Sequence, residues 1–191
     1  MKLFFALALM LSCHAWSETY NYEHKFGIGA NGGWAIPVLS EEFTDIAEDE
    51  VMYGFHLRYN TSQYDSLILN FSHLEFEKTA IAANVYDLIY LYRINSKDKL
   101  TPIIGLGAGV ADLDNARPYD KNLKFAARAR LGFEYALNPY FLLSIFADYL
   151  YLGKMPYHGD DDKRPERGLP GQEIHAVVPQ LGLTLYFDKN E

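Results

Sequence analysis

Residues 177–187 read VVPQLGLTLYF, and this stretch decides how the rest of the chain is interpreted. Its odd-numbered positions are apolar: Val177, Pro179, Leu181, Leu183, Leu185 and Phe187. Its even-numbered positions are mixed: Val178, Gln180, Gly182, Thr184 and Tyr186. Because successive side chains of a β-strand point to opposite faces, the stretch predicts a strand with one apolar and one mixed face.

Seven further stretches alternate in the same way, so we expect eight strands in all. They are placed at residues 25–34, 51–60, 64–75, 83–94, 99–111, 124–136, 140–152 and 173–187. The connections at 61–63, 95–98 and 137–139 are tight and 76–82 is intermediate, whereas 35–50, 112–123 and 153–172 are long and polar. This arrangement predicts an all-β fold, an eight-stranded antiparallel up-and-down transmembrane β-barrel.

The polar positions of the predicted strands are expected to face the barrel lumen, because charges in a membrane segment are tolerated only towards the interior. They form one set: His56, Arg58, Asn60, Asn70, Asp87, Arg93, Arg128, Arg130, Glu134, Ser144 and Asp148. An eight-stranded barrel is only just wide enough for its own side chains. We therefore expect a structural network of ion pairs, with a polar pore or gate as the alternative.

Two details of the lumen follow from the same pattern. Arg128 and Arg130 are expected to pair with Glu134, Asp87 or Asp148, because buried charges left unpaired are costly. Gly105, Gly107 and Gly109 all fall on the lumen face of 99–111, where they make room for large side chains.

The stretch 64–75 fits the alternation least well. Leu67, Leu69 and Phe71 share one parity, whereas Leu74 and Phe76 have the other. A β-bulge near Ser72 and His73 would restore a single apolar face, so a bulge is predicted there.

Aromatic residues gather towards the ends of the predicted strands, as interfacial girdles require. They are Phe26, Trp34, Tyr59, Tyr64, Tyr90, Tyr92, Tyr135, Tyr140, Tyr149, Tyr151 and Phe187. The structural alternative is a soluble calycin-type barrel, which also has alternating strands. Such a barrel needs neither aromatic ends nor an alternation of short and long connections.

The N-terminus resembles a secretory leader. Lys2 is followed by an apolar stretch to Ser12, and Ala15 and Ser17 are small residues at the positions that signal peptidase reads. We predict a signal peptide at 1–17 and a single barrel domain at 18–191, with lipidation of Cys13 as the alternative. No later segment is apolar and long enough for a membrane helix.

The predicted mature chain carries no cysteine and a net charge of about −9, against −8 for the 191 residues of the whole chain. Disulfides are therefore excluded after cleavage. The acidity also argues against nucleic acid as a partner, because nucleic-acid binding requires clustered Lys and Arg.

Taken together, these patterns resemble the eight-stranded outer-membrane barrels of the OmpA membrane domain, OmpX and opacity-protein type, and more loosely the OmpW type. The resemblance covers essentially the whole predicted mature chain. Its most specific part is the terminal strand, where Leu181, Leu183, Leu185 and Phe187 resemble the signal that the barrel-assembly machinery recognises. Family members commonly end on the aromatic residue, whereas four residues follow Phe187 here.

Other candidate chemistry is weaker. The acidic residues of 41–50 and the mixed charges of 160–167 are expected to be solvated surface, without a metal or another cofactor. A lipid A-modifying enzyme would need Ser, His and an acid together. The nearest residues are Ser72, His73 and Glu75, with Glu173 and His175 on the last strand; adjacent strand residues point to opposite faces, so no catalytic residue is assigned.

The sequence therefore predicts a monomeric, non-enzymatic protein of the outer membrane, with both termini in the periplasm. It would contact outer-membrane lipid, lipopolysaccharide and the barrel-assembly machinery. Its role would be structural, or interaction with a surface partner through loops 35–50, 112–123 and 153–172. Two alternatives stay open, an OmpW-like conduit for small hydrophobic molecules and a lipid A enzyme; an apolar upper lumen or a lateral opening would favour the conduit.

Overall fold

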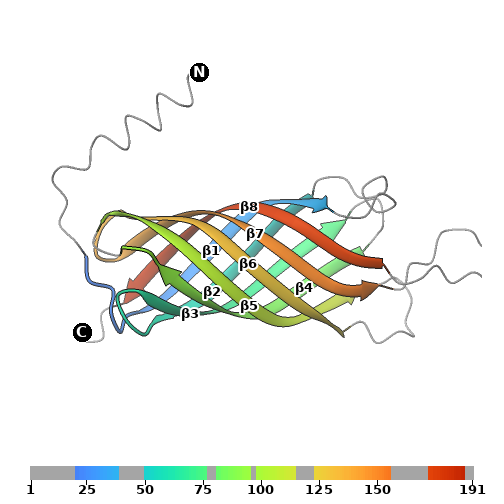
Figure 1. Cartoon of the computed structure of the whole chain (residues 1–191), viewed down its shortest axis with the longest axis horizontal. Coiled ribbons are helices and arrows are strands. Elements are labelled where there is room, and N and C mark those ends of the chain that lie inside the picture. Colours follow the sequence, from blue (N-terminus) through green and yellow to red (C-terminus); the bar gives the residue numbers. More distant parts are fainter. Residues whose placement is uncertain are drawn as a thin grey trace, which may run out of the picture.

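The computed structural model describes residues 20–38, 50–76, 81–95, 98–114, 123–155 and 172–187. Eight strands form a closed barrel in which each pairs antiparallel with its neighbours in sequence and β8 pairs with β1 (Figure 1). The strands are β1 (Phe26–Val38), β2 (Glu50–Asn60), β3 (Asp65–Phe76), β4 (Ile81–Arg93), β5 (Leu100–Asp114), β6 (Leu123–Ala136), β7 (Phe141–Met155) and β8 (Gln172–Phe187). The predicted fold class is confirmed.

The two ends of the barrel differ in how the strands are joined. At one end, here the tight-turn end, β1 begins, β8 ends, and short connections follow β2, β4 and β6. In one of these turns Asn138 Oδ1 accepts hydrogen bonds from the backbone amides of Tyr140 and Phe141, at 2.8 and 2.9 Å. The opposite end, the long-connection end, has strands joined through 39–49, 77–80, 115–122 and 156–171, which lie outside the described residues.

The strands reach further towards the long-connection end than the sequence predicted. β1 continues to Val38, β5 to Asp114 and β7 to Met155, and β2 begins at Glu50. The expected loops 35–50, 112–123 and 153–172 were therefore too wide. Backbone pairing continues beyond the stretch where side-chain polarity alternates, because the ladder depends on main-chain groups.

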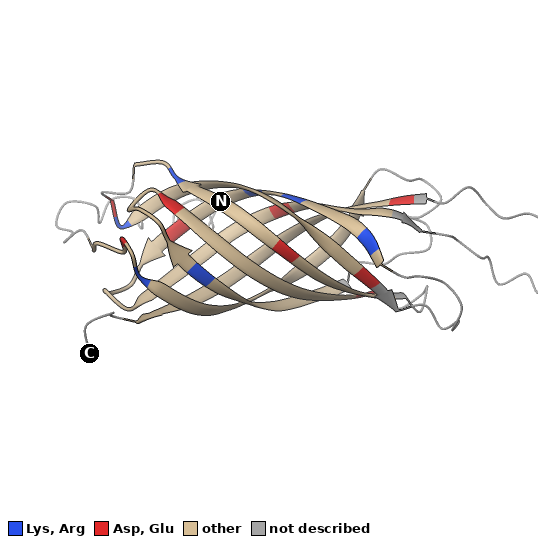
Figure 2. Cartoon of the chain, turned by 90° about the horizontal axis from the view of Figure 1, so that it is seen from below, with Lys and Arg blue, Asp and Glu red and all other residues tan. Residues whose placement is uncertain are grey.

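The outer surface of the barrel is apolar, and the assigned parity of β2, β6 and β8 is as predicted. Large exposed aliphatic side chains form its middle band: Ile28, Leu57, Leu69, Leu88, Leu106, Leu131, Ile145, Leu181 and Leu183. Charged positions are sparse along the strands (Figure 2), and seven of them have side chains buried in the lumen: Arg58, Asp87, Arg93, Arg128, Arg130, Glu134 and Asp148. This surface is what a barrel immersed in lipid requires.

Aromatic side chains on the outer surface pair across strands. Phe26 packs on Tyr59 with ring centroids 4.7 Å apart, and Phe55 packs on Phe71 at 4.8 Å. Trp34 is 59% exposed, although it lies within a strand. Exposed rings of this kind suit a membrane interface better than water.

The predicted bulge at Ser72 and His73 is wrong. β3 keeps an unbroken register with both neighbours, Tyr53 opposite His73 on one side and Asn84 on the other. Leu74 points into the lumen, and its side chain is fully buried there. This is compatible with an unbroken strand because the lumen is apolar at that height. The irregularity lies instead in β7, between Leu152 and Lys154, where Gly153 has φ +24°.

None of the described residues belongs to a helix long and apolar enough to cross a membrane. The predicted leader 1–17, including Cys13, lies outside the described residues.

Candidate functional site

The barrel interior is the candidate site, and it is built in layers. From the tight-turn end these are a mouth cluster (Tyr20, Tyr22, Ala136, Leu142 and Tyr186), the Glu134 network, a middle apolar layer (Ile68, Ile89, Leu91, Ile103 and Phe146), the Asp148 network and an end apolar layer. β6 shows this order, with Ala136 in the mouth cluster, Glu134, Arg130 and Arg128 in the two networks and Ala126 in the end layer, because inward positions recur every second residue.

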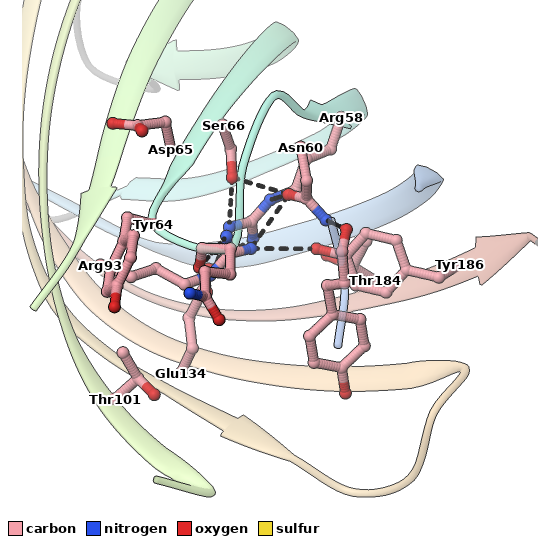
Figure 3. Close-up of polar contacts among 12 residues, drawn as sticks. Arg58, Asn60, Tyr64, Asp65, Ser66, Arg93, Thr101, Glu134, Thr184 and Tyr186 are labelled. Carbon is pink, nitrogen blue, oxygen red and sulfur yellow. Dashed lines mark hydrogen bonds and ion pairs between the residues drawn. The ribbon is translucent and has the colours of Figure 1, made fainter. Parts of the chain in front are cut away.

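The Glu134 network holds two arginines on one carboxylate (Figure 3). Arg58 Nη1 donates to Glu134 Oε1 at 2.5 Å, and Arg93 Nε donates to Glu134 Oε2 at 2.9 Å. Asn60 Oδ1 accepts from Arg58 Nε at 3.2 Å and from Arg93 Nη2 at 3.0 Å. Ser66 Oγ accepts from Arg58 Nη2 at 3.1 Å. All three charged side chains are at most 4% exposed.

The Asp148 network also holds two arginines, but on two carboxylates. Arg128 donates to Asp87 Oδ2 at 2.5 Å and to Asp148 Oδ2 at 2.6 Å. Arg130 makes a two-pronged contact with Asp148, at 2.8 and 2.9 Å. Ser72 Oγ accepts from Arg128 Nη2 at 2.9 Å. Charge-assisted bonds of this length are the strong class of hydrogen bond.

Amide side chains extend the Asp148 network to the seam between β8 and β1. Gln180 Nε2 donates to Asp148 at 2.8 Å, and Asn31 Nδ2 donates to Gln180 at 2.5 Å. Across the barrel, Asn70 Nδ2 donates to Asp87 at 2.9 Å. The network therefore ties β1, β3, β4, β6, β7 and β8 together.

Small residues make room for the large side chains that cross the lumen, as predicted for β5. A Cβ added at Gly109 would lie 2.8 Å from the Cβ of Asp87, and one added at Gly107 would lie 2.9 Å from Cγ1 of Ile89, both closer than side chains pack. The Arg130 guanidinium in turn lies 3.7 Å from the ring centroid of Phe146, a cation–π contact between the Asp148 network and the middle layer.

The end apolar layer fills the lumen near the long-connection end. It consists of twelve side chains, each at most 1% exposed: Ala35, Met52, Leu74, Ala83, Val85, Ala111, Ala126, Leu150, Leu152, Ile174, Ala176 and Val178. The sequence pattern did not predict this layer. We assigned the polar positions to the lumen and kept an apolar upper lumen only as the feature that would favour a conduit.

The tight-turn end is covered by residues that precede β1. Tyr22 is 7% exposed, its ring centroid lies 4.7 Å from that of Tyr186, and its hydroxyl donates to the carbonyl oxygen of Asn138 at 2.8 Å. Its own carbonyl accepts from Asn60 Nδ2 at 2.9 Å. Burial raises the pKa of the Tyr22 phenol, so the hydroxyl stays protonated and able to donate.

The structure places every residue of the predicted polar set in the lumen and brings most of them together. Arg128 and Arg130 find Asp87 and Asp148, and Glu134 pairs instead with Arg58 and Arg93. His56 lies apart from both networks, with Nε2 3.0 Å from Thr184 Oγ1. The predicted polar set left out Ser66, Ser72, Gln180 and Tyr22. The first three have the inward parity, whereas Tyr22 precedes the predicted strands and has no signal in the pattern.

The candidate catalytic residues do not assemble. Ser72 faces the lumen and contacts Arg128, whereas His73 faces outward, with Nδ1 2.8 Å from Asn84 Oδ1. His175 also faces outward, 2.6 Å from the hydroxyl of Tyr149 and 3.7 Å from Glu173. Within the described ranges, no group of three His, Cys, Asp or Glu side chains is placed to hold a metal ion.

Comparisons with known proteins agree with this geometry. A model of the family described as outer membrane protein beta-barrel domain matches residues 3–185. Neisserial surface protein A is similar in structure, with a TM-score of 0.63 and 12% identity over 85% of this chain and 97% of that chain. No curated protein matches the sequence.

Two barrels from Pseudomonas aeruginosa are similar as well. The outer membrane protein OprG has a TM-score of 0.58 and 13% identity over 90% of this chain and 99% of its own. The N-terminal barrel domain of OprF has a TM-score of 0.56 and 16% identity over 86% and 98%. At these identities the structural matches establish the fold alone.

Proposed function

Because the chain belongs to the outer membrane protein β-barrel family, we propose that it is a closed-lumen barrel of the outer membrane that acts through the segments joining its strands at the long-connection end. The barrel is the anchor and the scaffold in this proposal. It works as one chain, because β1 and β8 pair with each other and leave no free sheet edge in the described barrel.

The observation that carries this proposal is the layered interior. Two ion-pair networks and the apolar layers beside them cross the lumen with side chains that are almost completely buried. An ion crossing the barrel would have to displace paired charges and then enter a layer without polar groups. Both steps are costly, so the interior supports a scaffold better than a pore.

Conductance in planar bilayers tests the closed lumen. We expect no steady conductance from the purified protein, with heat-modifiable gel migration of the same sample showing that the barrel is folded. An open porin added to the same bilayer is the positive control. A stable conductance of porin size from the wild-type protein would replace the scaffold with a channel.

The orientation is the second part of the proposal. Bacterial barrels keep their short turns in the periplasm, which places the tight-turn end and both termini there. Protease added to intact cells should cut near Lys163, Arg164 or Arg167, and a tag inserted at Gly159 should be stained from outside. Staining of a tag at Ser96 from outside, with the Gly159 tag protected, contradicts the orientation and the surface role.

A conduit for small hydrophobic molecules is the second candidate, and the end apolar layer favours it. Leu74, Leu150 and their neighbours give the lumen an apolar lining at the end that faces outward in our orientation. The same side chains fill that space, so we expect liposomes with the protein to take up an apolar fluorophore no faster than empty ones. Faster uptake with the wild-type protein would support the conduit instead. A bulkier residue at Ala83 or Ala126 should then abolish the faster uptake.

We further propose that the protein is not an enzyme, because Ser72 and His73 lie on opposite faces of β3. Mass spectrometry of lipid A, after incubation of lipopolysaccharide with the folded barrel, should show no change in its acyl chains. A Ser72→Ala variant serves as the control: loss of an acyl chain with the wild-type protein alone would reverse this conclusion.

A further inference from the structure

The Glu134 network carries more positive than negative charge. Arg58 and Arg93 share Glu134, and the other partners of the two guanidinium groups are neutral oxygens of Asn60, Gln63, Ser66 and Tyr186. Among the buried groups, two cations on one carboxylate leave an excess of one positive charge. The carboxylates of Asp65 and Asp98 also lie near Arg93, but they stand at the less buried edge of the network. Because a buried charge is expensive unless it is balanced, the buried part of the network favours a further anion.

A small pocket opens beside this network at the tight-turn end. Its wall includes Arg93, Glu134 and Thr101, together with Lys99 and the rings of Tyr20 and Tyr22. The space within it that the centre of a water-sized sphere can reach is about 20 Å³, which is enough for one water molecule or a small ion. Asp98 also reaches the wall, but it is exposed and accepts from Asn95 at 2.7 Å.

Arg93 has a donor to spare towards this pocket. Its Nε and Nη2 are held by Glu134 at 2.9 Å and Asn60 at 3.0 Å. Among the described residues its Nη1 has one contact, a long one of 3.5 Å to the carbonyl oxygen of Gln63. Lys99 adds a second positive charge at the wall, with Nζ 5.8 Å from the ring centroid of Tyr20.

We propose that this pocket binds a single small monovalent anion, chloride in the cell, between Arg93 and Lys99. The anion neutralises the excess charge among the buried groups of the Glu134 network and accepts a hydrogen bond from Arg93 Nη1, which otherwise makes only the long contact to Gln63. Tyr20 and Tyr22 cover it on the side of the tight-turn end, which makes the N-terminal residues part of the site. The anion binds the folded barrel alone, so it stabilises the fold.

Urea unfolding in sodium chloride and in sodium gluconate at equal ionic strength tests the site, because gluconate is a much larger anion than chloride. Chloride should lower the unfolding equilibrium constant about threefold relative to gluconate, the ratio expected when its concentration is about twice the Kd. Gln63→Glu supplies a carboxylate at the pocket wall, and Lys99→Met removes a cation from it. Both should bring the ratio close to one.

Lys25→Met is the matched control. Lys25 lies at the same end of the barrel and also stands 5.8 Å from a tyrosine ring centroid, that of Tyr140, but it does not line the pocket. This variant should keep the wild-type ratio. Equal unfolding in chloride and gluconate, or an equal loss in Lys25→Met and Lys99→Met, overturns the proposal.

Crystals of the wild-type barrel grown in sodium bromide give a test that needs no variant. We expect an anomalous peak within hydrogen-bond distance of Arg93 Nη1. A pocket that holds water without anomalous signal contradicts the anion site, whatever the unfolding data show.

Discussion

The Glu134 and Asp148 networks are built from the same groups but balance their charges differently. Each holds two arginines. The Asp148 network sets Arg128 and Arg130 against Asp87 and Asp148 and is neutral. The Glu134 network sets Arg58 and Arg93 against one carboxylate.

Their places in the barrel explain the difference. The Asp148 network lies between the middle and end apolar layers, so neither water nor an ion reaches it without crossing apolar side chains. Its charges must therefore balance within the protein. The Glu134 network borders the pocket at the tight-turn end, where a counter-charge from solution can complete it.

Replacing Glu134 with Gln should have the largest effect on stability. The substitution keeps the shape of the side chain but leaves Arg58 and Arg93 buried without a carboxylate. A cost of about 3–5 kcal/mol in the free energy of unfolding is expected for an uncompensated buried charge. Urea unfolding in lipid vesicles, followed by the shift of the folded band on an unheated gel, measures it.

The double variant Glu134→Gln with Arg93→Met is the control, because it removes one cation together with the carboxylate. It should recover part of the lost stability. The single variant Arg93→Met measures the cost of removing the cation alone. If the double variant is less stable than Glu134→Gln by that same cost, the balance of charge does not stabilise this layer.

The sequence was sufficient to predict the strands of the barrel and which of their side chains face outward or inward. Alternation in 177–187 predicts which residues of β8 face outward, and in 124–136 it places Arg128, Arg130 and Glu134 inside. These predictions succeed because side-chain direction along a strand depends only on parity. The boundaries at the long-connection end were less accurate, because pairing of the main chain carries little signal in side-chain polarity.

The layers of the lumen could not be predicted in the same way. Arg130 and Asp148 face each other on the neighbouring strands β6 and β7. The pairs of Glu134 with Arg58 and Arg93, and of Arg128 with Asp87, join strands that are not neighbours, and parity does not determine the stagger between those. Leu74 shows the cost of one wrong assumption: a polar lumen made its parity look like a defect, and a bulge was predicted where β3 is regular.

Replacing Asp148 with Asn should cost less than Glu134→Gln, although Asp148 contacts both arginines. Asp87 remains in place and still pairs with Arg128, so a single guanidinium, that of Arg130, loses its carboxylate. A loss of about 3 kcal/mol, the lower end of the range for removing one partner of a buried ion pair, is expected. The same unfolding experiment ranks the two variants; a larger cost for Asp148→Asn would mean that depth outweighs charge balance.

Replacing Tyr22 with Phe should have the smallest effect and should act on the Glu134 side alone. The ring keeps its packing on Tyr186 and loses only the hydrogen bond to the carbonyl oxygen of Asn138. A single neutral hydrogen bond contributes about 1 kcal/mol to stability. Amide exchange should rise in the turn at 137–140, while the amides around Asp148 stay protected.

Tyr20→Phe is the matched control for Tyr22→Phe, since Tyr20 packs at the edge of the same mouth cluster. It should leave unfolding and exchange unchanged. An effect in Tyr22→Phe alone would show that the Tyr22 hydrogen bond stabilises the Glu134 network. No effect in either variant would show that the residues before β1 only pack against the network. Faster exchange around Asp148 in Tyr22→Phe would show that the two networks unfold as one, because the middle apolar layer would then fail to insulate them.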